Sequence, residues 1–193
     1  FTEGGDYCGS RYSFYSRSIG EIDAGAKSFG RVGPWEYAGM AVGTNGEQAT
    51  GILNLAYRPN DRLNVWAGWT GYYEPSEKLQ TDAGTVAVPS LRNNVVHVGA
   101  SFWKPLTVNG IYIDADLYRS TTAGASSGEA IDIDVDRYAS DDVLEYHLNF
   151  TQVSPDYDAR LGYMPEVGYR SAGGWLGESW LVNRRGIRRF RVS

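Results

Sequence analysis

Residues 111–118 read Ile-Tyr-Ile-Asp-Ala-Asp-Leu-Tyr, and residues 144–151 read Leu-Glu-Tyr-His-Leu-Asn-Phe-Thr. Apolar side chains occupy every second position in both stretches, and polar or charged side chains fall between them. Successive side chains of a β-strand point to opposite faces, so each stretch has one apolar face and one polar face. The same period of two recurs along most of the chain. The pattern predicts an all-β protein whose strands form an antiparallel meander.

The alternating segments divide the chain into about eight to ten strands. We expect them at roughly 21–32, 35–43, 50–58, 62–73, 94–103, 110–119, 143–152, 157–164, 174–182 and 186–192. The stretch Arg58–Asp61 and the pair Asn109-Gly110 predict hairpin turns, the second of type I′. Two connections, about 74–93 and about 120–142, are long. Short turns that alternate with long loops are typical of membrane barrels, so the expected fold is a membrane-type β-barrel or part of one.

Length and composition limit the class of protein. The 193 residues suit a single all-β domain spanning 1–193, and the net charge of −5 argues against a nucleic-acid partner. Many glycines, tyrosines and tryptophans with one cysteine, Cys8, suit a bacterial outer-membrane or secreted protein without an internal disulfide. The sequence has no run of about 18 apolar residues, so it predicts no transmembrane helix. A membrane barrel remains compatible with it, because barrel strands need only about 9–11 alternating residues. The chain begins without Met or an export signal, so we expect it to be part of a longer precursor or a mature piece after processing.

Aromatic residues cluster near the ends of the expected strands. In a membrane barrel such residues form girdles at the level of the lipid headgroups. The candidate girdle consists of Trp66, Trp69, Trp103 and Trp180. The alternative is that these rings cap the core of a soluble barrel or sandwich.

Three motifs resemble one bacterial family. Residues 14–20 and 23–33 are similar to its "FYSRRIG…GAKLTGKVG" block, residues 1–6 resemble its preceding "FLEGAD" run, and residues 153–165 resemble its "SPDFNPELGFVPR" segment. Members of this family carry an N-terminal domain like carbohydrate-binding family 9 and a C-terminal membrane β-barrel domain of unknown function. The resemblance covers about residues 1–170. It implies a location in the bacterial outer membrane, and a glycan or other solute as a possible ligand.

Candidate catalytic residues do not form a convincing constellation. The two histidines, His97 and His147, each occupy a polar position of an expected strand, where a hydrogen-bonded surface or lumen role is the commoner one. Nothing in the spacing requires Ser154, His147 and Asp158 to act as nucleophile, base and orienter. We therefore predict that the protein is not an enzyme and has no cofactor.

A weak calcium site is the one metal hypothesis that the sequence offers. Asp132, Asp134 and Asp136 alternate along the chain, and two further carboxylates follow at 141–142. Calcium takes six to eight oxygen ligands. However, Arg137 stands where an EF-hand loop needs glycine, and Val143 where it needs glutamate. The alternative is an acidic, solvated loop or strand rim.

Charged side chains define two further surfaces. We expect a polar or lumen-facing surface formed by Asp114, Asp116, Glu145, His147, Asn149, Asp158 and Arg160. A basic patch near the end of the chain comprises Arg184, Arg185, Arg188, Arg189 and Arg191. These arginines either contact an anionic partner or pair with acidic residues of neighbouring strands.

Two functions remain open. In the first, the chain is a non-enzymatic outer-membrane β-barrel, or a fragment of one, that contacts lipid and passes or recruits a solute. In the second, it is a structural β-sheet subunit that docks on a larger protein complex, on the periplasmic side of a membrane. Lipid contact requires a continuous apolar band about 25 Å tall on the outside of the sheet, whereas a soluble sheet would bury that face.

Overall fold

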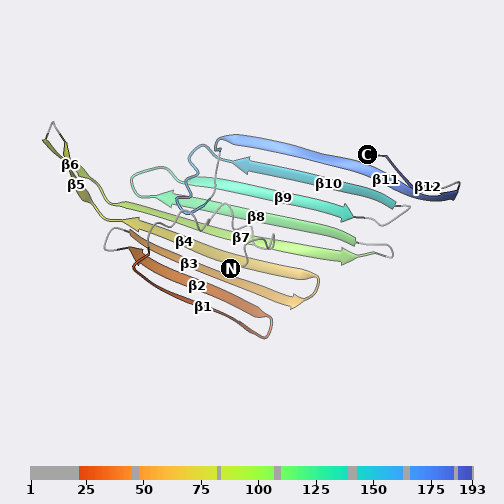
Figure 1. Ribbon diagram of the computed structural model, residues 1–193, viewed down its shortest axis with the longest axis horizontal. Coiled ribbons are helices and arrows are strands. Elements are labelled where there is room, and N and C mark those ends of the chain that lie inside the picture. Colours follow the sequence, from red (N-terminus) through yellow and green to blue (C-terminus); the bar gives the residue numbers. More distant parts are fainter. Residues whose placement is uncertain are drawn as a thin grey trace.

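The computed structural model of the protein describes residues 22–44, 48–81, 84–106, 110–138, 143–162, 166–184 and 187–192. The described chain is all-β. Ten strands form one antiparallel sheet, in which they pair in the order β1-β2-β3-β4-β7-β8-β9-β10-β11-β12, the order of the chain with β5 and β6 left out (Figure 1). The predicted antiparallel meander is confirmed. The strands of the sheet are β1 (Ala24–Val32), β2 (Trp35–Thr44), β3 (Gln48–Asn60), β4 (Leu63–Glu74), β7 (Leu91–Pro105), β8 (Gly110–Thr122), β9 (Gly128–Tyr138), β10 (Val143–Val153), β11 (Tyr169–Arg184) and β12 (Ile187–Val192).

Two segments that we expected to be long loops contain strands. Within 74–93, β5 (Glu77–Thr81) and β6 (Gly84–Val88) pair as a separate two-stranded ribbon that projects from one end of the sheet. Within 120–142, β9 pairs with β8 on one side and β10 on the other. The acidic residues of β9 obscured its alternation, because a run of carboxylates resembles a solvated loop. Asp132, Asp134 and Asp136 therefore lie in the sheet.

Two other expectations were wrong. Residues 157–162 do not form a strand but an irregular segment, and 163–165 lie outside the described residues. The type I′ turn at 109–110 is also wrong, since Gly110 belongs to β8 and pairs with Pro105, which leaves 106–109 as the connection. A Cβ atom at Gly110 would collide with the ring of Trp103, so this glycine accommodates a cross-strand aromatic ring.

The turn at Arg58–Asp61 is present, one or two residues later than expected. β3 continues to Asn60, and the side-chain oxygen of Asn60 accepts hydrogen bonds from the backbone nitrogens of Arg62 (2.9 Å) and Leu63 (3.1 Å). An asparagine that hydrogen-bonds the backbone two residues on is a common turn former.

The two ends of the sheet differ in their connections. At one end the links between paired strands are short: 33–34, 61–62, 106–109, 139–142 and 185–186. At the other end lie the β5–β6 ribbon and the long connection 154–168, together with the shorter links 45–47 and 123–127 (Figure 1). We name these the short-turn end and the long-connection end. Membrane barrels commonly show this asymmetry.

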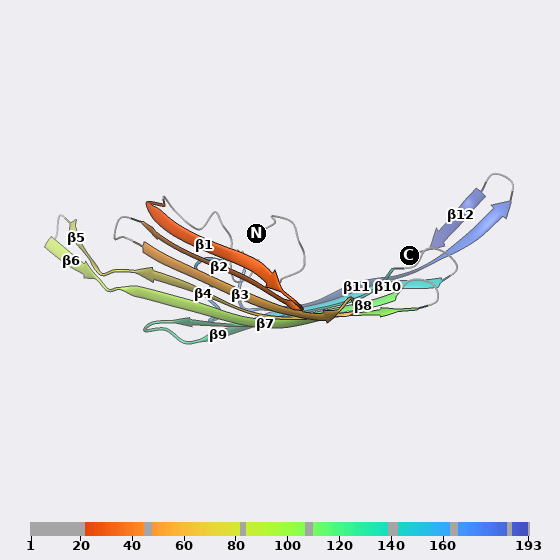
Figure 2. The same ribbon diagram turned by 90° about the horizontal axis from the view of Figure 1, so that it is seen from below.

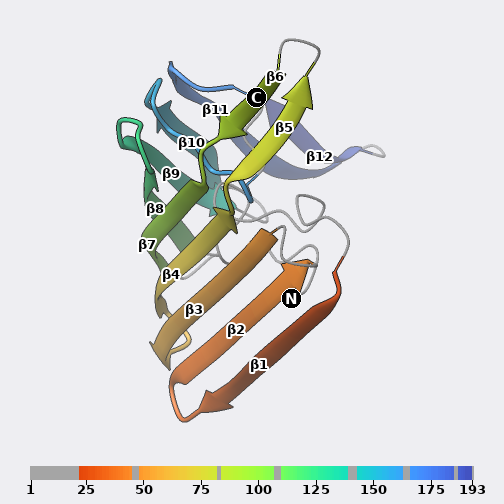
Figure 3. The same cartoon turned by 90° about the vertical axis from the view of Figure 1, so that its left-hand side faces the viewer.

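The sheet is strongly curved. Seen nearly along the strands, it forms an open C with β1 and β12 at the two tips and β7 to β9 in the middle (Figure 3). The turned view in Figure 2 shows the same trough, with β1 and β12 rising on its two sides. β1 and β12 each pair with one neighbour within the described sheet.

The described residues contain no helix with the length and apolar character needed to cross a membrane.

Candidate functional site

The strand register assigns every described side chain of the sheet to one of two faces. Residues paired across strands share a face, and in the middle of the sheet Asp116 pairs with Gly99 and Asp132, whereas Leu117 pairs with Val98 and Ile131. The same register sorts the side chains of β8 and β10. Asp114, Asp116, Glu145, His147 and Asn149 lie on one face, which we call the polar face, and Ile113, Ala115, Leu117, Tyr146, Leu148 and Phe150 lie on the other, the apolar face.

The apolar face carries exposed large hydrophobic side chains across most of the sheet. Leu117 is 51% exposed, although its neighbour Asp116 is only 2% exposed. The exposed apolar side chains of this face include Tyr37, Leu53, Leu55, Val65, Val96, Val98, Phe102, Ile113, Ile133, Leu144, Leu148 and Leu176. An exposed apolar surface of this extent marks contact with a protein or a membrane.

Charged residues bound this apolar surface at both ends of the strands. At the long-connection end lie Arg92, Arg119 and Glu129, and at the short-turn end lie Lys104 and Arg137. Between these charges the positions of this face on β7, β8 and β9 are apolar except Asn94, which lies next to Arg92 near the end of β7.

The four tryptophans of the candidate girdle divide between the faces. Trp69 and Trp180 are exposed on the apolar face, where Trp69 donates a hydrogen bond from Nε1 to Asn94 Oδ1 (3.2 Å). Trp66 and Trp103 lie on the polar face, as their pairing with Gly99 and Tyr112 shows. The sequence placed the aromatic residues mostly near strand ends but did not reveal on which face each tryptophan lies.

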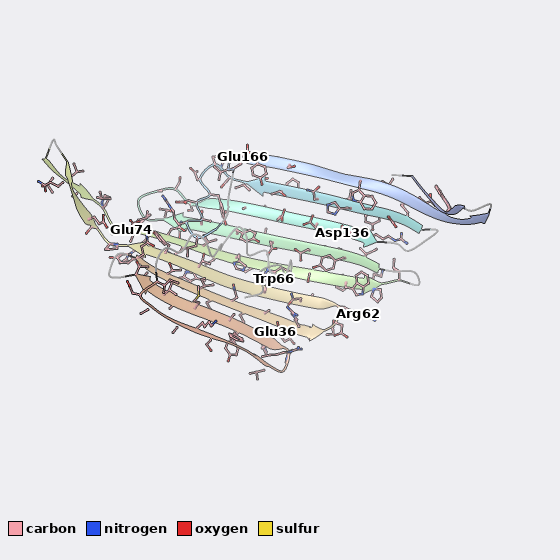
Figure 4. The ribbon with its side chains drawn as sticks, viewed as in Figure 1. Glu36, Arg62, Trp66, Glu74, Asp136 and Glu166 are labelled. Carbon is pink, nitrogen blue, oxygen red and sulfur yellow. The ribbon has the colours of Figure 1, made fainter. Side chains whose placement is uncertain are left out.

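The polar face lies on the inside of the curve and buries polar groups. Trp66, in the middle of the sheet (Figure 4), donates a hydrogen bond from Nε1 to Asp116 Oδ1 (2.8 Å), and both side chains are buried. Gly99 lies between them, and a Cβ atom there would meet both side chains. Asp116 and Glu145 are thus on the predicted face but are not solvated, because the inward curvature crowds their neighbours over them.

Several carboxylates of the polar face have hydrogen-bond partners. Asp132 accepts a hydrogen bond from the Thr151 hydroxyl (2.6 Å), and Asp136 contacts the Nδ1 atom of His147 on the neighbouring strand β10. Asp114 accepts a hydrogen bond from the hydroxyl of Tyr112 (3.2 Å). This part of the polar face is therefore a hydrogen-bonded acidic wall.

The calcium hypothesis gains no support from this arrangement. Among the described residues, no three or more His, Cys, Asp or Glu side chains are grouped in a way that could hold a metal ion. Asp132, Asp134 and Asp136 lie on alternate positions of one extended strand, so their backbones are about 7 Å apart from one to the next. The carboxylates at 141–142 lie outside the described residues.

The histidines have separate environments. His147 contacts Asp136, whereas His97 is buried on the polar face against the ring of Tyr118, with 5.6 Å between ring centroids. Nδ1 of His97 has no hydrogen-bond partner within the described part of the chain. The structure does not assemble the Ser154, His147 and Asp158 trio, because residues seven positions apart along an extended strand are about 23 Å apart.

The connection after β10 folds onto the polar face. We call Ser154–Gly162 the inner segment. Its side chains at 157, 159 and 161 are buried. Tyr157 and Ala159 belong to the main buried cluster of the described residues, which also contains Val95, Tyr118, Ala130 and Val153. The alternation of buried and less buried residues at 157–161 comes from an irregular segment with turns at both ends, which packs on the polar face and is not paired in the sheet.

Hydrogen bonds fix the inner segment to three strands in turn. Ser154 exchanges hydrogen bonds with the backbone of Glu129 on β9 (2.8 and 2.9 Å), and the backbone nitrogen of Asp158 donates to the Ser120 hydroxyl on β8 (2.9 Å). The backbone of Tyr157 passes so close to Gly128 that no Cβ would fit there.

Asn93 on β7 completes the attachment. Its Nδ2 donates to the carbonyl of Asp158 (2.8 Å), and its Oδ1 accepts from the backbone nitrogen of Arg160 (3.2 Å). Asn93 is among the most buried side chains of the described chain. Sequence reasoning missed this residue, since an asparagine near a strand end carries no signal of a partner 65 residues away.

Asp158 and Arg160 are the less buried residues that alternate with the buried positions 157, 159 and 161 of the inner segment. Their side chains form an ion pair, with 3.0 Å between Arg160 Nε and Asp158 Oδ2. The side chain of Arg160 is 49% exposed and that of Asp158 is 36% exposed. The carboxylate of Asp158 also accepts a hydrogen bond from the hydroxyl of Thr122 (3.1 Å). Both residues lie on the inner segment over the polar face and do not belong to a strand.

The short-turn end of the polar face holds a basic and aromatic pocket. The pocket has a volume of about 460 Å³ and is lined by Arg31, Arg58, Arg62, Trp103 and Tyr112, among others. Arg31 and Arg58 each approach Glu36, at 3.7 and 3.3 Å. Figure 4 shows Glu36 and Arg62 at this end and Glu74 at the opposite one.

The predicted basic patch can be placed only in part. β11 ends at Arg184, and β12 contains Arg188, Arg189 and Arg191, with Arg189 paired to Leu181 and Arg191 to Ser179. Arg185 lies outside the described residues, as does the resemblance motif at 1–20.

Comparisons with models of protein families, with curated proteins and with solved structures found no match to this chain.

Proposed function

We propose that the chain forms ten consecutive strands in the wall of a bacterial outer-membrane β-barrel, with lipid against the apolar face and water on the polar face. One observation carries the proposal: large apolar side chains are exposed on one face across most of the described sheet, while charged side chains are buried on the other face. Soluble domains show the opposite arrangement, because apolar side chains gain free energy by leaving water.

The height of the apolar band supports lipid as its occupant. The bounding charges are eight residues apart on β9 (Glu129 to Arg137) and twelve apart on β7 (Arg92 to Lys104). At about 3.4 Å per residue and a strand tilt of roughly 40°, these spans correspond to about 21 and 31 Å along the membrane normal. The outward apolar band of known membrane barrels is about 25 Å tall.

Closure of the wall requires partners for β1 and β12. Each has one free edge in the described sheet, and a strand edge exposes unpaired backbone groups that cannot remain unpaired in lipid. We propose that further strands, or these two edges themselves, complete the barrel. The resemblance noted in the sequence implies the same kind of barrel, with a solute or glycan passing or being recruited and no catalytic role.

Spin labels on the two faces test this proposal. In the full native chain with Cys8→Ser, single cysteines replace Leu117 or Leu148 on the apolar face and Asp134 or Asn149 on the polar face. In lipid vesicles we expect labels at 117 and 148 to be relaxed by dissolved oxygen, and labels at 134 and 149 by a water-soluble nickel chelate. Equal exposure of all four labels to the chelate would contradict the proposal.

The open edges favour a second candidate, the structural subunit that docks on a membrane complex. A free strand edge is a template for adding a strand of another chain. Carbonate washing of the cell envelope separates the two functions. A barrel wall stays in the membrane pellet, whereas release within a larger complex would favour the docking subunit.

A further inference from the structure

The inner segment lies across the water-exposed side of the wall. It leaves β10, crosses β9 and β8, and reaches β7. Ser154 is hydrogen-bonded to β9, Asp158 to β8 and Arg160 to β7. Three strand spacings of about 4.8 Å make this a crossing of about 14 Å. In a barrel, a segment attached to the inner face occupies part of the water-filled path.

The attachment fixes the segment in place. Tyr157 and Leu161 are buried, and Asn93 holds two backbone groups of the segment from below. The close approach to Gly128 leaves no room between segment and wall. The segment is therefore a built part of the wall rather than a loose loop.

The outward side of the segment presents one donor and one acceptor. Arg160 and Asp158 are the charged side chains that alternate with its buried ones, and the hydroxyl of Thr122 holds the Asp158 carboxylate in position. The ion pair has no net charge, and the hydrogen bonds seen among the described residues use Arg160 Nε and Asp158 Oδ2 but neither the terminal guanidinium nitrogens nor Asp158 Oδ1. Such a pair suits hydrogen bonding to uncharged polyhydroxyl molecules, whose neighbouring hydroxyls both donate and accept.

We infer that the inner segment narrows the path through the barrel and that Asp158 and Arg160 contact uncharged polyhydroxyl solutes at this constriction. This inference rests on the proposed barrel function. The constriction limits the size of the solutes that pass, and Asp158 and Arg160 are the two side chains that set this limit. Pore diameter and the hydrogen-bonding groups of the lining are the properties that determine which solute passes.

Vesicle swelling with polyols of increasing size tests the inference. The full native chain is reconstituted, and the swelling rates with erythritol, mannitol and raffinose are measured for two variants. In the first, two glycines replace residues 156–161. In the second, D158A and R160A remove only the outward side chains and leave Tyr157 and Leu161 in place.

We expect the deletion to raise the raffinose-to-erythritol rate ratio about threefold or more, and the double alanine variant to raise it about twofold, because both widen the path. The matched control removes residues 77–88, the β5–β6 ribbon, which is the other long connection at the same end. It should leave the ratio unchanged.

The outcomes separate this inference from the proposed function. A native chain that does not enter vesicles, or that gives no swelling with erythritol, would contradict the barrel itself. If vesicles with the native chain swell, but the double alanine variant inserts normally and has the same raffinose-to-erythritol rate ratio, the inference that Asp158 and Arg160 form a constriction is wrong. The double alanine variant decides the matter even if the deletion variant does not fold.

Discussion

The two faces of β8 and β9 share one backbone but have opposite surroundings. On the polar face, which is the inside of the curve, Asp116 is buried against Trp66, and Tyr118 is buried in the cluster that includes Tyr157 and Ala159 of the inner segment. On the apolar face, Leu117 between them is half exposed and contacts no covering layer within the described chain. The comparison shows that a side chain of the described sheet is buried when it lies on the concave face, where neighbouring side chains and the inner segment cover it, whether it is polar or apolar.

This reversal has a direct energetic meaning. A buried carboxylate needs a hydrogen-bond donor, and Trp66 provides one for Asp116. An exposed leucine in water forgoes about 1.5–3 kcal/mol of burial free energy. A row of such leucines is stable when the medium outside the sheet is itself apolar.

The largest expected effect comes from placing a charge on the apolar face. If the chain is the barrel wall proposed above, L148R should destabilise it in lipid by about 2–4 kcal/mol, because arginine near the bilayer midplane must leave water. The measurement is the free energy of unfolding by urea in lipid vesicles.

The matched control is N149R, one residue along the same strand. Asn149 pairs with Asp134 on the polar face, so an arginine there gains a nearby carboxylate and should cost less than about 1 kcal/mol. If both variants cost a few tenths of a kcal/mol, as surface changes on soluble proteins do, the two faces are in the same solvent.

The second expected effect tests the crowding inside the curve. G99A places a Cβ atom against the ring of Trp66 and the carboxylate of Asp116, and we expect a loss of about 1–3 kcal/mol of stability from overpacking. The control is G39A on β2, where the nearest atom to a Cβ is 3.6 Å away, an ordinary contact. Equal stability of the two variants, measured by the same unfolding experiment, would show that the polar face is not tightly packed.

The period of two predicted most of the sheet. It located the strands β1 to β4, β7, β8 and β10. It also put Asp114 and Ala115 on opposite faces, because a one-residue slip of the register would exchange the two faces completely. It missed β9, whose Asp132, Asp134 and Asp136 look like a solvated loop until the register places them on the inside of a curve.

The position of the inner segment could not be predicted. Its buried residues Tyr157 and Leu161 have the spacing of a strand, and its partner Asn93 lies far away in the sequence. Curvature was also invisible, since alternation gives the two faces of a strand but not which one is concave. Burial of Asp116 and Trp66 follows from that curvature.

The third expected effect compares two tryptophans. W66F removes the Nε1–H donor to Asp116 and leaves a buried carboxylate with one partner fewer, which should cost about 1–3 kcal/mol. W69F removes a longer hydrogen bond to Asn94 on the exposed face and should cost a few tenths of a kcal/mol. Unfolding followed by circular dichroism, which does not depend on tryptophan fluorescence, measures both. A larger loss for W69F would reverse the assignment of the buried face.

The smallest expected effect separates the rim of the polar face from its centre. Glu36 lies near the short-turn end, and its contacts with Arg31 and Arg58, at 3.7 and 3.3 Å, involve partly exposed side chains. Ion pairs in contact with water contribute about 0–1 kcal/mol and are screened by salt. E36Q should therefore lower stability by a few tenths of a kcal/mol in dilute buffer, and the difference should vanish in about 1 M salt, where the screening length is near 3 Å. The Trp66–Asp116 contact is buried, so the cost of W66F should persist in the same salt. A salt-independent cost for E36Q would mean that water does not reach this end of the polar face, and the water-filled path would then have to be narrower there than at the inner segment.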